Sequence, residues 1–325
     1  MAVYTQLGAE TLGRLIAEFE VGALRSVKGI AEGVSNSNWL VETAGGDGTG
    51  ARFILTMYER RFEIADLPFF LGLLDHLAAR GCPVPRTIHD RADAKYRLLD
   101  GKAVALIEFL PGVSLSQPTP TQAHAVGAAL AQMHAAAADF PGTRANDLGL
   151  EGWRHLATEC GPEGLDSLRP GLAAQVAHEL ALLGDTWPSY LPRSVIHSDL
   201  FPDNVLMLGD TVSGLIDFYF ACTDLTAYDV AVTHAAWCFD SGGERFDPAL
   251  SAALLAGYEA VRPLLAAERA AMPLLARGAA LRFLMTRAYD WMNTPADALV
   301  TRKDPLAFAR RLDFYADPAS AGIFT

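Results

Sequence analysis

The chain has 325 residues, 51% of them hydrophobic and 20% charged, a balance that allows a substantial core and excludes a wholly disordered protein. Its formal net charge of −12 argues against nucleic acid as a partner, because such binding requires a basic surface. No apolar run reaches the length of about 18 residues that a membrane span requires, so no membrane partner is expected.

The start of the chain predicts no export. Its first residues, Met-Ala-Val-Tyr-Thr-Gln, lack the basic and apolar regions of a secretory signal, and a cytoplasmic location is expected. Apolar residues at helical spacing after Thr11 predict a helix through Phe19. Three strands are predicted next, over Ala23–Lys28, Asn38–Thr43 and Arg52–Tyr58.

The segment Ala44–Gly50 lies between the last two of these strands and is rich in glycine. It predicts a surface turn, and a phosphate cradle is the alternative, although its glycines match neither G-x-G-x-x-G nor a P-loop. A helix is predicted over Leu67–Arg80, because its apolar residues recur at helical spacing and Gly81 is suited to end it.

A β-hairpin is predicted around Asp100-Gly101, because this pair supplies the positive φ angles of a type I′ turn. Its strands are Tyr96–Leu99 and Lys102–Phe109. Pro111-Gly112 then ends regular structure, which places the domain boundary after residue 110. The expected domains are therefore residues 1–110 and 111–325.

The second domain is predicted to be mainly helical. Thr119-Pro120 is suited to begin a helix that continues to His134. One short β region, Val195–Asp217, interrupts a series of alanine-rich helices around residues 171–184, 226–239, 248–261, 266–292 and 304–315. The chain has four cysteines, Cys82, Cys160, Cys222 and Cys238, and they form no C-x-x-C pair. This spacing predicts free, mostly buried thiols of a reducing compartment, and one disulfide between two of them is the alternative.

The short β region carries a pattern that indicates chemistry, H-x-D-x-x-x-x-N followed by a hairpin and Asp-Phe. Two short strands around a tight turn bring Asp217 back beside Asn204, and so cluster both with Asp199. Phosphoryl transfer needs such a set: one carboxylate accepts the proton of the attacking hydroxyl, while an amide and a second carboxylate are hard oxygen ligands for Mg²⁺. Taken singly, these residues and His197 have ordinary explanations as turn, cap or structural residues. The joint pattern predicts a kinase-type site.

On these residues, the chain resembles the aminoglycoside phosphotransferase and choline kinase family, protein-kinase-like enzymes that phosphorylate small molecules. Within that family it resembles the bacterial homoserine kinases of the phosphotransferase-like type most. The resemblance extends over nearly the whole chain. The segments that carry it are Gly33–Asn38, Phe53–Glu59, Asp66–Phe70, Ile196–Val205 and Arg282–Trp291.

The resemblance implies roles for the residues of the catalytic segment. Asp199 is the aspartate that orients or deprotonates the substrate hydroxyl, by positioning and electrostatics. Asn204 and Asp217 ligate Mg²⁺ on the phosphates of ATP, and His197 supports the loop. Asp229 resembles an aspartate that braces the catalytic loop in the family, and a charge at a helix N-terminus is the alternative.

The resemblance also implies where ATP binds. A loop between the first two strands presents backbone N–H groups to phosphate oxygens, with an Asn/Ser-rich hairpin turn as the alternative. Thr56 stands where the kinase pattern has a lysine, so the cation that anchors the phosphates is unassigned, with Arg52, Arg60 and Arg61 nearby. The loop residues are Gly33, Val34, Ser35, Asn36, Ser37 and Asn38, and the hinge residues that read adenine are Glu108, Phe109 and Leu110.

A pocket for homoserine should contain an arginine and an acid, because this substrate carries a carboxylate, an ammonium and a primary hydroxyl. The helix 281–292 places Arg287 and Asp290 three positions apart, next to Trp291. For each candidate, an intrahelical ion pair or a core position is the alternative. The further candidates are Arg282, Tyr219, His234 and Trp237.

Together these features predict an α+β, bilobal protein-kinase-like fold, with an N-terminal lobe of five antiparallel strands and a larger helical C-terminal lobe. The resemblance implies ATP- and Mg²⁺-dependent phosphorylation of the side-chain hydroxyl of L-homoserine to O-phospho-L-homoserine, a step of threonine biosynthesis, by a monomer or homodimer. One alternative is a phosphotransferase of the same fold acting on choline, an aminoglycoside or another amino alcohol. A second alternative, suggested by the missing lysine, is a non-catalytic relative that binds nucleotide or acts as a scaffold.

Overall fold

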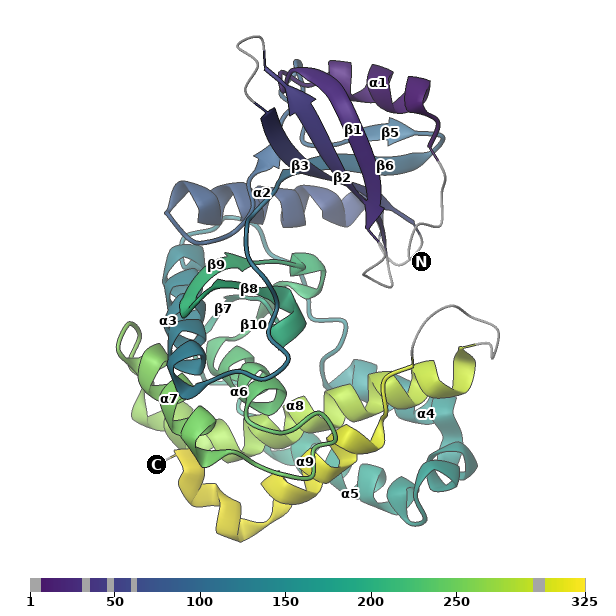
Figure 1. Cartoon of the computed structure of the whole chain (residues 1–325). Helices are drawn as coiled ribbons and strands as arrows, with labels where there is room; N and C mark the ends of the chain where they lie inside the picture. Colours follow the sequence, from purple (N-terminus) through teal and green to yellow (C-terminus); the bar gives the residue numbers. More distant parts are fainter. Residues whose placement is uncertain (1–6, 31–35, 46–49, 60–62, 295–301, 325) are drawn as a thin grey trace. The chain divides into compact units, whose positions relative to one another are not determined.

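The structure, a computed structural model, describes residues 7–30, 36–45, 50–59, 63–294 and 302–324 (Figure 1). The chain divides into two compact units, Met1–Pro111 and Gly112–Thr325. No helix in these described ranges is long and apolar enough to cross a membrane.

The first unit is built on a six-stranded antiparallel sheet in the order β1-β2-β3-β6-β4, with β5 also paired to β6. The prediction of five strands is wrong, because β4 has two residues and is too short to show a strand pattern. Asp100 and Gly101 both have positive φ, which confirms the predicted hairpin turn. The strands are β1 (Ala23–Ile30), β2 (Asn36–Ala44), β3 (Gly50–Tyr58), β4 (Thr87–Ile88), β5 (Arg97–Leu99) and β6 (Lys102–Glu108).

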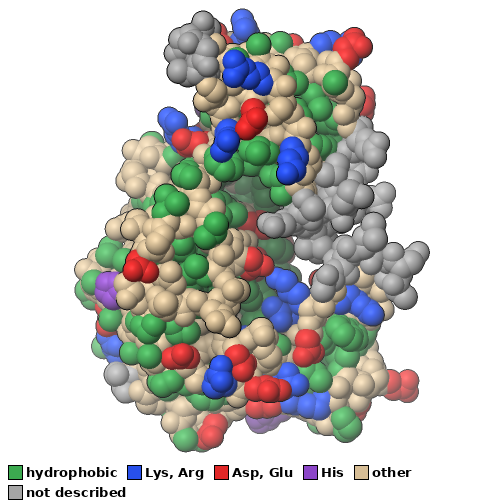
Figure 2. Space-filling view, in the orientation of Figure 1, with side chains coloured by type: hydrophobic (Ala, Val, Ile, Leu, Met, Phe, Trp, Pro, Cys, Tyr) green, Lys and Arg blue, Asp and Glu red, His purple; other side chains and the backbone are tan. Residues whose placement is uncertain are grey.

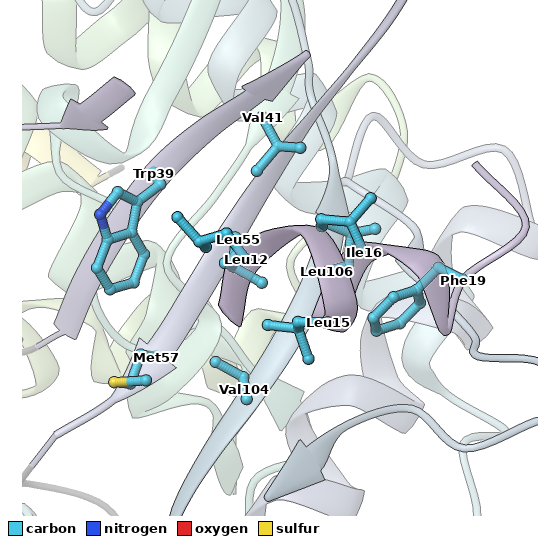
Figure 3. Close-up of a cluster of buried hydrophobic side chains, with 10 residues drawn as sticks. All are labelled: Leu12, Leu15, Ile16, Phe19, Trp39, Val41, Leu55, Met57, Val104 and Leu106. Atoms are coloured by element: carbon cyan, nitrogen blue, oxygen red, sulfur yellow. The ribbon is translucent and has the colours of Figure 1, made fainter. Parts of the chain in front are cut away.

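A hydrophobic core forms between α1 (Ala9–Ala17) and one face of this sheet (Figure 3). Leu12, Leu15 and Ile16 share one side of α1, because they recur at helical spacing. Burying such side chains contributes roughly 1.5–3 kcal/mol each. A second helix, α2 (Leu67–Ala79), has Pro68 in its first turn. The sheet contributes Trp39, Val41, Leu55, Met57, Val104 and Leu106 to the core.

The second unit is mainly helical. Thr119 begins its first helix with a capping box, in which Thr119 and Gln122 each bind the other's backbone N–H. One helix, α4, was not predicted, because Gly161-Pro162 interrupts its pattern and Gly161 has non-helical φ and ψ angles. The helices are α3 (Pro120–Ala137), α4 (Leu150–Leu168), α5 (Leu172–Thr186), α6 (Thr226–Trp237), α7 (Pro248–Glu259), α8 (Ala266–Asn293) and α9 (Leu306–Ala316).

The β region of this unit consists of two separate antiparallel pairs. β8 (Val205–Leu208) pairs with β9 (Thr211–Leu215), as the hairpin pattern predicts. β7 (Arg193–Ile196) pairs instead with β10 (Cys222–Leu225), which extends the predicted region beyond Asp217. Next comes α6, whose residues are all buried and which packs against α3, α7 and α8 (Figure 1).

The thiols agree with the prediction from the cysteine spacing. Cys82, Cys160, Cys222 and Cys238 are all free and buried. Burial raises the pKa of Cys160 to about 11, so this thiol is protonated at neutral pH. Cysteine therefore serves this chain as a small apolar residue.

Candidate active site

The β8–β9 hairpin brings the predicted catalytic and metal-binding residues together. At its open end the backbone N–H of Ile216 donates to the Asn204 carbonyl oxygen at 3.0 Å, which places Asp217 next to Asn204. The Asn204 side chain turns toward Asp199: its Nδ2 donates to the Asp199 carbonyl oxygen at 2.8 Å and to Asp199 Oδ2 at 3.1 Å. The hairpin thus places all three residues at one end, as predicted from the spacing.

The backbone around Asp199 is held by buried side chains from distant parts of the chain. Asp229 accepts from the N–H groups of His197 and Ser198, both at 2.7 Å. Trp237 Nε1 donates to the Leu200 carbonyl oxygen at 2.9 Å. Because buried peptide groups need hydrogen-bond partners, these contacts fix the path of the loop before and after Asp199.

Arg282 binds the same loop from α8. Its Nη1 donates to the carbonyl oxygen of Ser198 and, at 2.8 Å, to Ser198 Oγ. Ser198 has a φ of 67°, a left-handed conformation that is uncommon for a residue with a side chain. The guanidinium is buried and lies 4.5 Å from the Phe283 ring centroid. We therefore assign Arg282 to stabilising the loop rather than to the substrate pocket.

His197 has both ring nitrogens engaged inside the site. Its Nδ1 accepts from the backbone N–H of Asp199 at 3.2 Å, and its Nε2 lies 3.0 Å from the Ile216 carbonyl oxygen. A carbonyl oxygen only accepts, so Nε2 carries the proton. Burial lowers the pKa of His197, which keeps the ring neutral. This side chain supports the loop and has no nitrogen left for proton transfer.

A further histidine, which the sequence analysis did not single out, supports Asp229. His134 Nε2 lies 3.0 Å from Asp229 Oδ2, and His134 Nδ1 lies 2.8 Å from Tyr258 Oη. Burial opposes ionisation of Asp229, but the bonds from His134 and from the loop N–H groups keep the pKa of Asp229 below its usual value. A lone histidine within a helix gives no sequence signal for this role.

The two site carboxylates have raised pKa values. Desolvation, together with the negative charges of Asp217 and Asp203, raises the pKa of Asp199 to about 7, while Arg282 and Lys303 oppose the shift. Asp217 reaches solvent, yet the protein atoms around it desolvate it enough to raise its pKa to about 6, and Asp203 adds to this. Two carboxylates that ionise this reluctantly form a site suited to a cation.

The side-chain chemistry fits a magnesium ion that is shared with a ligand. Because Asn204 Nδ2 faces two oxygens of Asp199, the amide orientation is determined and Oδ1 is the oxygen left to ligate. Asp217 supplies a carboxylate. Among the described residues, no group of three or more His, Cys, Asp or Glu side chains is placed to hold a metal. A magnesium ion here would therefore be completed by phosphate oxygens and water.

Comparison with known proteins establishes the family. Residues 26–264 match the phosphotransferase enzyme family. The chain belongs to that family. It is 53% identical over 321 residues to a homoserine kinase of Azorhizobium caulinodans, with 99% of this chain and 98% of the relative covered. It is 51% identical over 321 residues to a homoserine kinase of Acidiphilium cryptum, with the same shares of 99% and 98% covered.

Among solved structures, the amicoumacin kinase hAmiN in complex with AMP-PNP, Ca²⁺ and Ami superposes with a TM-score of 0.70. The sequence identity is 14%, and 95% of this chain and 93% of that chain are covered. The likeness shows the phosphotransferase fold, an N-terminal antiparallel sheet followed by a helical region, and confirms the predicted fold class.

The nucleotide-loop candidates of this family member are described in part: Gly33, Val34 and Ser35 lie outside the described residues. Thr56 Oγ1 donates to Asn38 Oδ1 at 2.8 Å. Both residues lie on the sheet face opposite the α1 core, because Leu55 and Met57 face that core and strand residues alternate. Ser37 Oγ donates to Glu59 Oε1 at 2.6 Å on the core side.

The structure of the first unit tests one of the three arginines that were candidates to anchor the phosphates. Arg52 pairs with Glu42 at 3.1 Å, toward the end of β3 opposite to the nucleotide loop, so it is a poor candidate. Arg60 and Arg61 lie outside the described residues. Of the predicted hinge, Glu108 pairs with Arg86 at 3.1 Å, and Phe109 and Leu110 follow β6 directly.

The predicted substrate residues separate into core and accessible positions. His234 is buried, with its nitrogens 2.7 Å from Tyr315 Oη and 2.8 Å from Ser251 Oγ, and Trp237 is bound to the loop backbone. We therefore do not assign His234 or Trp237 to substrate binding, because both side chains are buried and their polar atoms are already hydrogen-bonded within the protein. The candidates with accessible surface are Tyr219, Arg287, Asp290 and Trp291.

Proposed function

We propose that this chain is a homoserine kinase that transfers the γ-phosphoryl group of ATP to the side-chain hydroxyl of L-homoserine. The observation that carries the proposal is the 53% identity, over 99% of the chain, with a homoserine kinase. The clustered Asp199, Asn204 and Asp217 supply the groups that this chemistry requires. The intact site also argues against a non-catalytic relative.

Asp199 is the proposed proton acceptor. Its Oδ2 is held by Asn204, which leaves Oδ1 to accept a hydrogen bond from the substrate hydroxyl. A pKa near 7 allows the carboxylate to take up the hydroxyl proton as that oxygen attacks phosphorus. The loop contacts of Asp229 and Arg282 hold the carboxylate in place, so its contribution is positioning as much as basicity.

Magnesium and ATP complete the proposed site. Asn204 Oδ1 and Asp217 are the residues that would hold Mg²⁺, which neutralises phosphate charge when it is bound. The described nucleotide-loop residues Asn36, Ser37 and Asn38, together with Thr56 and the hinge 108–110, are the candidates for ATP. The amicoumacin kinase complex, with its bound AMP-PNP and Ca²⁺, supports nucleotide and divalent-cation binding by this fold.

The substrate assignment is tested by measuring ADP release with a panel of acceptors at saturating Mg·ATP: L-homoserine, L-serine, L-threonine, choline and kanamycin. We expect the highest kcat/KM with L-homoserine, and phosphorus NMR should identify its product as a phosphate monoester. Turnover confined to choline or kanamycin would contradict the homoserine assignment and leave the kinase assignment intact. Absence of turnover with every acceptor, despite nucleotide binding, would favour the non-catalytic alternative.

A further inference from the structure

A group of charged and aromatic side chains surrounds Phe201, two positions after Asp199. The guanidinium carbon of Arg287 lies 4.5 Å from the Phe308 ring centroid and 5.9 Å from that of Phe201. Lys303 Nζ lies 5.5 Å from the Phe201 centroid. On the second unit, Lys and Arg side chains gather beside Asp and Glu side chains (Figure 2).

Arg287 differs from Arg311 and Arg282 in how many of its guanidinium donors are hydrogen-bonded within the protein. Arg311 donates to three backbone carbonyl oxygens at 2.7–2.9 Å, and Arg282 binds Ser198. Among the described residues, Arg287 makes one hydrogen bond, from Nη1 to the Asp304 carbonyl oxygen at 3.3 Å. No carboxylate of the described residues lies within ion-pair distance of Arg287. Most of its guanidinium donors therefore remain for a ligand.

The charged form of Arg287 is disfavoured by its surroundings, so a bound anion would stabilise it. Burial and the charge of Arg311, which lies 4.5 Å from the same Phe308 ring, lower the pKa of Arg287 to about 10. The acids that act on it most strongly are Asp199, Asp203 and Asp304. The charge of Arg311 opposes that of Arg287, and a carboxylate bound at Arg287 would relieve this repulsion.

We propose that Arg287 binds the α-carboxylate of the amino-acid substrate and so sets the preference for homoserine over amino alcohols. The inference rests on the proposed function. A guanidinium fork matches a carboxylate. Homoserine carries its hydroxyl and its carboxylate at the two ends of a short chain. Asp199 lies close enough to Arg287 for its charge to raise the pKa of the guanidinium, so one homoserine molecule would present its hydroxyl to Asp199 and its carboxylate to Arg287. Lys303 is less suited, because it already pairs with Asp203 at 3.2 Å.

The experiment compares two acceptors that differ only in the carboxylate, L-homoserine and 3-amino-1-propanol. Arg287→Met keeps a stem that packs on Phe308 but removes the fork. We expect kcat/KM for homoserine to fall about 10- to 100-fold, the range of a charge-assisted hydrogen bond, and the value for aminopropanol to change less than about threefold. Where aminopropanol turns over too slowly, its inhibition constant against homoserine replaces kcat/KM.

Two further variants complete the test. Arg287→Lys keeps the charge and the fold, and should lose homoserine kcat/KM selectively but by less. Arg154→Met is the matched control, because Arg154 is an exposed arginine of α4 paired with Glu151, and it should alter neither acceptor. As a readout independent of turnover, L-homoserine should raise the melting temperature of the wild type but not of Arg287→Met.

Four outcomes would overturn the inference. An equal loss for both acceptors would mean that Arg287 supports the fold of the site. An increase in KM for ATP with an unchanged KM for homoserine would mean that its ligand is a phosphate. If the wild-type chain does not phosphorylate homoserine, the proposed function fails first and the inference falls with it, whereas turnover that is insensitive to Arg287 refutes the inference alone.

Discussion

At the scale of single residues, the site is a short loop whose polar groups are bound by buried side chains. Ser198 has a left-handed conformation, and Arg282 donates to its carbonyl oxygen. Asp229 accepts from the N–H groups of His197 and Ser198. Such a backbone conformation persists only when the surrounding structure determines it. The position of the Asp199 carboxylate therefore depends on residues that do not meet the substrate.

The two site aspartates should respond differently to removal of their charge. Asp199→Asn removes the proton acceptor, and we expect kcat to fall about 10²- to 10⁴-fold with little change in the Mg²⁺ requirement. Asp217→Asn removes a proposed metal ligand and should raise the Mg²⁺ concentration for half-maximal activity. Steady-state assays at varied Mg²⁺ distinguish the two effects.

The matched control is Asp210→Asn, at the exposed turn of the same β8–β9 hairpin, which should leave both parameters unchanged. Full turnover by Asp199→Asn would refute its role as proton acceptor. An unaltered Mg²⁺ dependence of Asp217→Asn would remove it from the metal site.

At the scale of secondary-structure elements, α3 and α7 pack closely through two glycines. A Cβ at Gly127 would lie 2.0 Å from the Leu254 carbonyl oxygen, and a Cβ at Gly257 would lie 2.0 Å from that of His124. A hydrogen bond between His134 of α3 and Tyr258 of α7 also joins these helices, and the same histidine hydrogen-bonds to Asp229. Their close approach thus connects helix packing to the catalytic loop.

Gly127→Ala should lower the free energy of unfolding by about 1–3 kcal/mol, because the added methyl group forces the helix backbones apart. Denaturant unfolding followed by circular dichroism measures the change. The control is Gly13→Ala in α1, where a Cβ meets no atom within 4 Å. That variant should be neutral or more stable by up to about 1 kcal/mol, because alanine favours helix. Equal effects at both positions would contradict the packing argument.

At the scale of the whole molecule, buried histidines couple stability to pH. His234 of α6 binds Tyr315 of α9 and Ser251 of α7, and so ties three helices together. Burial lowers the pKa of His234 to about 3, whereas an unfolded histidine titrates near pH 6.5. Between these values the unfolded chain binds the proton and the folded chain does not.

The free energy of unfolding should therefore decrease as the pH falls from about 6.5 toward 3, by up to about 1.4 kcal/mol per pH unit from His234. Asp199 and Asp217 act in the opposite direction, because their raised pKa values make the folded chain bind protons near pH 6 to 7. The difference between the wild-type and His234→Gln profiles isolates the histidine. That difference should narrow with acidification, and a difference independent of pH would contradict the assignment.

Much of the fold followed from local pattern. The Asp100-Gly101 hairpin and the capped start of α3 were predicted from short-range rules, and the structure shows both. The helix α4 and the two-residue strand β4 were missed, because a Gly-Pro interruption and a very short strand leave no periodic signal. The β7–β10 pairing was missed because strand partners distant in sequence have no local signature.

The sequence by itself determined the chemistry, because Asp199, Asn204 and Asp217 are joined by one loop and one hairpin, whose geometry follows from spacing and turn residues. Only the tertiary structure decided which residues hold that loop. Arg282 lies 84 positions after Ser198, and His134 lies 95 positions before Asp229. Their partners are set by helix packing, in which a buried polar group bonds to whatever the packed helices place beside it, and no local pattern records that choice.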